Sequence, residues 1–300
     1  MVSLPSGVNI NNLIEDLKTF SWKAADILIN YSEKIRNLDF KNKILKTLDQ
    51  NDPVTEADLM VNELIINNIQ GKYPDINWGI LSEENVKKES FIPNTKSEWL
   101  WVLDPLDGTK DFIQGTGNYA MHLALNYKQK AYIGVVLIPA KDELWITDGV
   151  KVWCERRANS YKKTPLSTKN NLQEMVLVTS KNHRNENLNK LIKIINFKKV
   201  IIMGSIGCKI SSILKGESDI YISMSLPGES APKDWDFAAP EAILKAAGGA
   251  ITNLENQELT YGGLNYQKGG IIVASNNCET HKNLCLQLGK IIKEYNIYPL

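Results

Sequence analysis

The spacing of hydrophobic residues changes along the chain, and each spacing predicts a different element. Apolar side chains recur at helical intervals over residues 11–31 and again over 59–69, which predicts two amphipathic helices. Continuous apolar runs at 78–81 and 99–103 are too short for helices and predict buried strands. Residues 119–127 alternate large apolar side chains with Ala, His, Ala and Asn, which predicts a strand whose two faces meet different neighbours. The first third of the chain therefore combines two helices with the beginning of a sheet.

Three further strands are expected in the first half of the chain, at residues 131–138, 142–147 and 150–154. Asp148 and Gly149 between the last two form a hairpin turn signal. The sequence up to residue 157 thus predicts an antiparallel meander preceded by helices. We place a first lobe at residues 1–157.

A lysine- and asparagine-rich stretch after residue 157 marks a change of organisation. Beyond it, strand and helix patterns alternate, which is typical of an α/β lobe and places a second lobe at residues 158–300. The expected strands are 175–179, 200–203, 219–223 and 271–274, and the expected helices are 187–195, 210–214, 235–247 and 279–295.

Composition excludes several classes of protein. Of 300 residues, 35 are Lys or Arg and 34 are Asp or Glu, so the net charge of +1 does not indicate binding to a nucleic acid polymer. The four cysteines form no CxxC pair, which argues against a zinc site and a disulfide scaffold. No signal-peptide pattern opens the sequence, and no apolar run approaches the roughly 20 residues of a membrane span. We therefore expect a cytoplasmic protein with no membrane partner.

Two carboxylates mark the end of the buried run at 99–103. Asp104 and Asp107 follow it directly, and Pro105, which has no N–H to donate to a sheet ladder, predicts that the strand stops at Asp104. Paired acids at a buried strand end are costly without a cation. With the carbonyl oxygen of Leu106 between them, they suit Mg²⁺, which prefers oxygen ligands.

Further acids precede or follow other predicted elements. Glu83 follows the run at 78–81, and Asp58 lies at the start of the second helix. Asp236 is expected at or near an N-cap, because Pro240 is tolerated best in the first turn of a helix. Each acid alone has an ordinary structural explanation, as a loop residue or as an acid favoured at a helix start. His122 is interpreted as a buried histidine of the sheet.

Three segments together resemble the signatures of the inositol monophosphatase superfamily, a group of lithium-sensitive, Mg²⁺-dependent phosphatases. These segments are Ser82-Glu83-Glu84, Asp104-Pro105-Leu106-Asp107-Gly108-Thr109 and Trp235-Asp236-Phe237-Ala238-Ala239. The resemblance implies a layered α-β-α-β-α sandwich with an antiparallel N-terminal lobe and a mixed C-terminal α/β lobe. Residues 52–58 and 107–112 are similar to the 3′(2′),5′-bisphosphate nucleotidases of that superfamily, in particular the bacterial and cyanobacterial branch.

The resemblance also implies roles for single residues. Two to three Mg²⁺ ions are expected: one held by Glu83, Asp104 and the Leu106 carbonyl, a second by Asp104, Asp107 and Asp236, and a weaker third organised by Asp58 and Glu83. Thr109, paired with Asp58 or Glu83, would orient and deprotonate the attacking water.

Substrate contacts are expected at two turns and one histidine. The backbone N–H groups of Gly108 and Thr109 would hold the phosphate at a helix start. The turn that contains Ser205 and Lys209 would meet a second phosphate or the ribose through free N–H groups, or is only a tight turn with a solvated lysine. His183 falls where related nucleotidases have a histidine near the nucleotide.

The substrate implied is a small nucleotide bisphosphate, 3′-phosphoadenosine 5′-phosphate or its 5′-phosphosulfate, and the pathway implied is sulfate assimilation. One basic residue expected from the family is Ser223 here, and Lys233 is a candidate replacement. Activity on inositol monophosphate or fructose 1,6-bisphosphate is the first alternative. A binding or regulatory protein that has lost the chemistry is a second. The sequence leaves a homodimer open.

Overall fold

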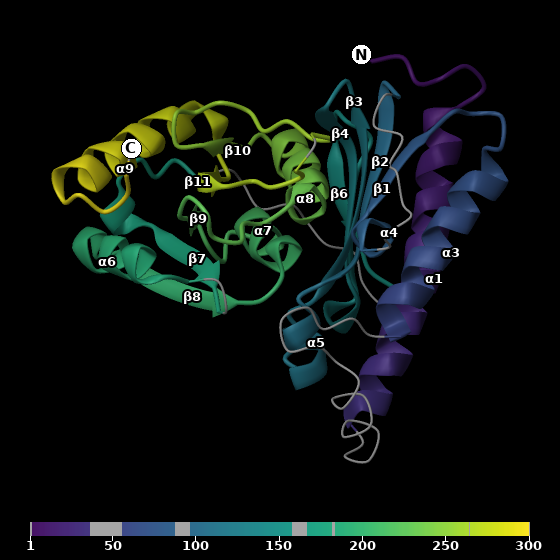
Figure 1. Cartoon of the computed structure of the whole chain (residues 1–300), viewed down its shortest axis with the longest axis horizontal. Coiled ribbons are helices and arrows are strands. Elements are labelled where there is room, and N and C mark those ends of the chain that lie inside the picture. The colour runs from purple at the N-terminus through teal and green to yellow at the C-terminus, as the bar shows by residue number, and fades with distance from the viewer. Residues whose placement is uncertain are drawn as a thin grey trace.

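The chain folds into five layers that contain two β-sheets (Figure 1). The computed structural model describes residues 2–36, 56–87, 97–157, 167–181, 184–263 and 265–299. Helices α1 (Ile10–Arg36) and α3 (Glu56–Lys72) form one outer layer. Helices α7 (Ile206–Leu214) and α8 (Asp234–Ala246) lie between the sheets, and α6 (Glu186–Ile195) and α9 (Cys278–Glu294) form the other outer layer. The α-β-α-β-α sandwich is therefore confirmed.

The first sheet has the order β1-β2-β3-β4-β5-β6. Strand β1 runs parallel to β2, and the remaining pairs are antiparallel. Its strands are β1 (Gly79–Ser82), β2 (Trp99–Asp107), β3 (Ala120–Tyr127), β4 (Lys130–Ile138), β5 (Glu143–Thr147) and β6 (Val152–Glu155). Two short helices, α4 (Glu83–Val86) and α5 (Thr109–Gln114), begin at the ends of β1 and β2.

The second sheet has the order β10-β11-β9-β7-β8 and is mixed, as expected. Strand β7 pairs in parallel with β8 and β9, whereas β11 is antiparallel to both of its neighbours. Its strands are β7 (Val176–Ser180), β8 (Lys199–Met203), β9 (Ile220–Ser225), β10 (Ala250–Asn253) and β11 (Gly270–Ser275).

Three hydrophobic clusters hold the layers together, and β3 shows how the sequence builds two of them. Tyr119, Met121, Leu123 and Leu125 pack in the cluster under α1 and α3. Ala120 and Ala124 point to the opposite face and pack in the cluster with α7 and α8. The small residues allow α8 to lie close to the sheet, so that this helix can bring its own acid to the end of β2.

Several boundaries differ from the sequence predictions. Helix α7 begins at Ile206 instead of residue 210, because Ser205 caps it by accepting a hydrogen bond from the Cys208 N–H (3.3 Å). Helix α4 and strand β10 were not expected, since segments of four residues carry too little periodicity to detect. None of the helices in the described ranges is long and apolar enough to span a bilayer.

Candidate active site

A β-bulge in β2 brings the two acids of that strand to one side of the sheet. Asp104 lies opposite His122 on β3 and Asp107 lies opposite Ala120, so β2 takes one residue more than β3 over the same distance. Residues three apart in a regular strand point to opposite faces, and the additional residue removes that difference. The prediction that the strand stops at Asp104 is wrong, because Pro105 lies in the bulge, where the ladder is already interrupted.

Asp236 reaches the same place from α8. Lys233 is the N-cap of this helix, so Asp236 is its third residue, close to the N-cap as expected, whereas Pro240 lies beyond the first turn in the helix interior. One carboxylate oxygen of Asp236 accepts the Lys233 N–H at 2.5 Å. Carboxylate oxygens of Asp104, Asp107 and Asp236 all lie within 4.8 Å of one another.

The acids repel one another strongly in the absence of a cation. Asp104 is 1% exposed, and burial followed by the charges of Glu83, Asp107, Asp236 and Asp58 raises its pKa well above the ordinary value. Burial and the Asp107 charge raise the pKa of Asp236 to about 8, although the Lys233 N–H opposes the shift. Glu83 and Asp58 thus lie near enough to act on Asp104 electrostatically. A set of oxygen donors with this much uncompensated charge fits a hard divalent cation such as Mg²⁺.

The turn after β2 requires glycine at position 108. Gly108 has φ +90°, and a Cβ there would lie 2.9 Å from the Asn118 carbonyl oxygen and 3.2 Å from the Ser205 nitrogen. The Thr109 hydroxyl, which follows, donates to the Leu106 carbonyl oxygen at 3.2 Å. Within the described residues it makes no hydrogen bond with Asp58 or Glu83, so the expected pairing is absent from this structure.

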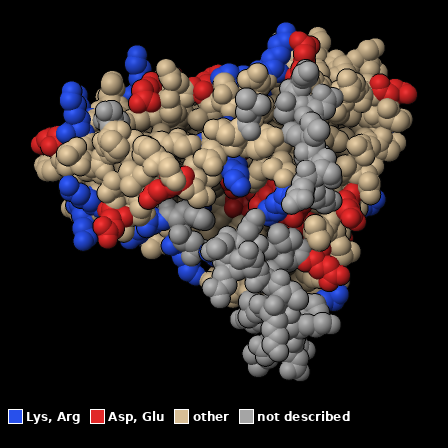
Figure 2. All heavy atoms as spheres, in the orientation of Figure 1, with Lys and Arg blue, Asp and Glu red and all other residues tan. Residues whose placement is uncertain are grey.

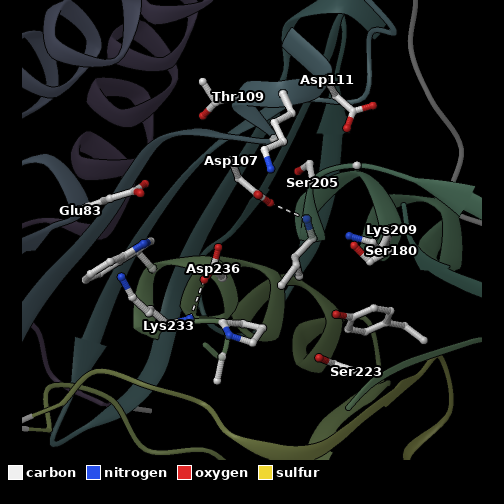
Figure 3. Close-up of a pocket in the computed structure, with 18 of the residues that line it drawn as sticks. Glu83, Asp107, Thr109, Asp111, Ser180, Ser205, Lys209, Ser223, Lys233 and Asp236 are labelled. Atoms are coloured by element: carbon white, nitrogen blue, oxygen red, sulfur yellow. Dashed lines mark hydrogen bonds between the residues drawn. The ribbon is translucent and has the colours of Figure 1, made fainter. Parts of the chain in front are cut away.

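A pocket of about 250 Å³ opens beside the acids and is lined from both sheets and from α7 and α8 (Figure 3). Glu83, Asp107 and Asp236 line one part of it. Basic and hydroxyl side chains line much of the remainder: Lys110, Lys209, Lys233, Thr109, Ser180, Ser205, Tyr221, Ser223 and Ser230. On the face shown in Figure 2, acidic and basic side chains meet near the centre of the molecule. The pocket therefore offers acids for a cation beside cations for an anion.

Lys209 is the most buried cation of this pocket. It is 3% exposed, and its ammonium lies 5.5 Å from the centroid of the Tyr221 ring. Burial lowers the pKa of Lys209 in spite of the nearby Asp107 charge. Among the described residues its ammonium makes no hydrogen bond or ion pair. The sequence alternative of a solvated lysine is therefore wrong.

The N–H groups of the same turn, in contrast, are already occupied. The Ile206 N–H donates to Asp107, the Gly207 N–H to His122 Nε2 (3.1 Å), and the Cys208 N–H to Ser205 Oγ (3.3 Å). The expectation of free N–H groups for a second phosphate is wrong for these three residues, because each N–H already donates a hydrogen bond to a side chain of the protein.

The structure shows the positions of only some of the other predicted substrate residues. Ser223 and Lys233 line one pocket, and the Lys233 ammonium lies 5.2 Å from the centroid of the Trp235 ring. His183 and residues 52–55 lie outside the described residues. Tyr221 and Asp111 also line the pocket and were not predicted as site residues; the lysine–tyrosine contact joins α7 to β9, which no local pattern reveals.

The fold and the pocket together define a class of protein, a layered α/β sandwich with a candidate metal site between its sheets. The chain belongs to the inositol monophosphatase family, whose family model matches residues 11–293.

Relatives of two kinds are similar to the chain. The 3′(2′),5′-bisphosphate nucleotidase CysQ of Buchnera aphidicola is 32% identical over 235 residues, which cover 78% of this chain and 79% of that protein. The Nus factor SuhB of Escherichia coli is 30% identical over 236 residues, covering 75% and 79%. The solved structure of inositol monophosphatase from Anabaena matches with a TM-score of 0.70 at 23% identity, over 94% of this chain and 97% of that one, which shows the shared fold.

Proposed function

We propose that the chain is a Mg²⁺-dependent phosphatase that removes the 3′-phosphate of 3′-phosphoadenosine 5′-phosphate and of its 5′-phosphosulfate, in sulfate assimilation. The observation that carries the proposal is the pocket in which three clustered carboxylates lie beside a buried lysine whose ammonium has no hydrogen bond or ion pair within the described part of the chain. Such a pocket suits a ligand that brings one phosphate to the acids and a second anion to the lysine. Its partner would be a small nucleotide in the cytoplasm.

The acids would hold the metal in the arrangement that the family resemblance implies. Glu83, Asp104 and the Leu106 carbonyl would form one site, Asp104, Asp107 and Asp236 a second, and Asp58 with Glu83 a weaker third. Bound Mg²⁺ would neutralise phosphate oxygens and lower the pKa of a coordinated water.

The protein groups would position the phosphate and the water around that site. Because the Thr109 hydroxyl donates to Leu106, its oxygen lone pairs remain available to accept a hydrogen bond from the attacking water. Gly108 brings the first N–H groups of α5 beside the same acids, where they would hold the phosphate. The catalytic part of the proposal therefore rests on Asp58, Glu83 and Thr109.

The nucleotide assignment is supported by the cationic part of the pocket. Lys209 and Ser205 would meet the second phosphate or the ribose, with Lys233 nearby in place of the basic residue that Ser223 replaces. A nucleotidase among the relatives, 32% identical, agrees with this assignment.

A substrate panel tests the proposal. Purified protein is incubated at equal concentrations of 3′-phosphoadenosine 5′-phosphate, inositol monophosphate and fructose 1,6-bisphosphate, with Mg²⁺, with and without lithium, and phosphate release is measured. We expect a clear preference for the nucleotide and inhibition by lithium. Preference for inositol monophosphate would refute the substrate assignment. No release from any substrate would favour a regulatory protein. The similarity to a Nus factor, SuhB, is the reason for considering that alternative.

A further inference from the structure

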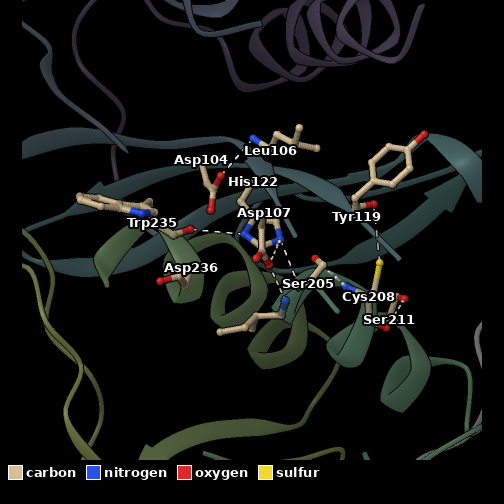
Figure 4. A network of polar contacts seen from close by, with 12 residues as sticks. Asp104, Leu106, Asp107, Tyr119, His122, Ser205, Cys208, Ser211, Trp235 and Asp236 are labelled. Carbon is tan, nitrogen blue, oxygen red and sulfur yellow. Dashed lines mark hydrogen bonds and ion pairs between the residues drawn. The ribbon is translucent and has the colours of Figure 1, made fainter. Parts of the chain in front are cut away.

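His122 lies where three elements of the site meet (Figure 4). It is fully buried on β3, directly opposite Asp104 of β2. Its Nε2 accepts the Gly207 N–H of α7 at 3.1 Å, and its Nδ1 lies 3.4 Å from the Trp235 carbonyl oxygen of α8. One imidazole therefore bridges the strand next to the acids, the helix that carries Lys209 and the helix that carries Asp236.

These contacts define how the ring is protonated. A backbone N–H can only donate, so Nε2 must be unprotonated, and the ring proton lies on Nδ1, where it points to the Trp235 carbonyl. The 3.5 Å between Nε2 and Asp107 Oδ2 is then a contact and not an ion pair.

The backbone of α7 is adapted to this histidine. A Cβ on Gly207 would lie 2.3 Å from His122 Nε2 and 2.6 Å from Val136 Cγ1, so any larger residue would displace the ring or the helix. The preceding N–H, that of Ile206, donates to Asp107. Two successive N–H groups of α7 thus hold side chains of two adjacent strands, which fixes the helix relative to the acids.

We infer that His122 is a positioning residue of the active site, which sets α7 and α8 against the acids of β2 through two separate hydrogen bonds. The inference rests on the proposed phosphatase function for its kinetic consequences, but not for the contacts themselves. The Nε2 bond positions Ser205 and Lys209 on the substrate side. The Nδ1 bond positions Asp236, the residue after Trp235, on the metal side.

Two substitutions separate the two bonds. His122→Gln can place its Oε1 near the position of Nε2 and accept the Gly207 N–H, but it loses the donor to Trp235. His122→Asn can place its Nδ2 near Nδ1 and donate to Trp235, but it loses the acceptor for Gly207. We expect His122→Asn chiefly to raise KM for the nucleotide, and His122→Gln chiefly to weaken Mg²⁺ binding, each by about fivefold or more, the scale of one lost hydrogen bond.

His281→Gln serves as the matched control. His281 is also a buried histidine with two partners, Ser275 (2.7 Å) and Thr252 (2.9 Å), but it lies on α9 against the second sheet, outside the pocket. This variant is expected to lower Tm without changing KM or Mg²⁺ affinity. Mg²⁺ binding is measured by calorimetry on each protein without substrate, and KM and kcat by phosphate release below the Tm of the least stable variant.

The wild-type protein provides a test that needs no variant. Nitrogen-15 NMR of the histidine rings should show for His122 a neutral imidazole protonated at Nδ1 at pH 7. A proton on Nε2 would overturn the inference, because Nε2 could then not accept the Gly207 N–H. So would His122 variants that lose Tm as His281→Gln does but keep KM and Mg²⁺ affinity within twofold of wild type. If the wild type hydrolyses no phosphate ester, the proposed function fails, while the NMR and calorimetric results still decide the role of His122.

Discussion

Replacing Lys209 by methionine tests whether the pocket is built for a second anion. The substitution keeps most of the side-chain volume and removes the charge. In the free protein Lys209 is 3% exposed, and burial lowers its pKa even though Asp107 and Asp236 attract the ammonium. The folded protein therefore accommodates this charge less well than water does, which is an unusual property for a residue that stabilises only the fold.

The size of the effect follows from the bond that is lost. A hydrogen bond to a charged group contributes about 1.5–3 kcal/mol, and every 1.4 kcal/mol is tenfold in affinity. Lys209→Met should thus raise KM for the nucleotide bisphosphate about 10- to 150-fold. KM for a monophosphate that lacks the second anion should change far less. Because a poorly solvated charge is removed, the free protein should not lose stability, whereas buried substitutions usually cost about 0.5–3 kcal/mol.

Initial rates of phosphate release from 3′-phosphoadenosine 5′-phosphate and from 3′-AMP, together with urea unfolding of the free protein, check both expectations. Lys193→Met, which removes an exposed lysine of α6, is the control for loss of charge as such. An equal rise in KM for both substrates would remove Lys209 from recognition of the second anion. A large loss of stability without a change in KM would make it a structural residue.

Three further predictions concern other parts of the molecule. Asp104→Asn should lower kcat by at least about a hundredfold while raising Tm in metal-free buffer, because it relieves repulsion in the acid cluster; retained turnover would refute its place there. Gly108→Ala should cost about 1 kcal/mol or more in urea unfolding, since φ is +90°, and should reduce kcat; wild-type values for both would contradict the close approach to Asn118. Glu241, which accepts a hydrogen bond from Tyr261, has its pKa raised by burial from 4.5 to about 7, so the wild type loses stability as pH rises through that range. Glu241→Gln should therefore gain about 3 kcal/mol relative to wild type between pH 4.5 and 8, measured by urea unfolding at both pH values, and a pH-independent difference would disprove the shift.

The elements with regular periodicity could be predicted because their pattern is local. From residue 119 into β3, large residues at 119, 121, 123 and 125 alternate with small or polar ones, and the structure places the large residues in one cluster and the alanines in another. The acids were also accessible to sequence reasoning, since each stands near the beginning or end of an element. Asp104 and Asp107 needed only a strand and its end to be recognised as candidates.

What the sequence could not provide is the register between elements. Nothing near Asp104 in the sequence reveals that β2 takes one more residue than β3, yet this bulge decides whether Asp104 and Asp107 face the same side. Similarly, the turn before α7 predicts free N–H groups from its local geometry, and only the packing of α7 on the first sheet shows that Asp107 and His122 occupy them.

His122 illustrates the same limit most directly. In the sequence it is one of the small or polar residues on the inner face of β3, and a buried histidine of a sheet is a sufficient explanation for it. Its two partners, Gly207 and Trp235, lie 85 and 113 residues away in the chain. The sequence does not relate a glycine in the first turn of a helix to a histidine in a strand; the structure does, because a Cβ at position 207 would collide with the ring. His122 therefore supports the pocket between the sheets, because it holds in place the two helices that complete the pocket.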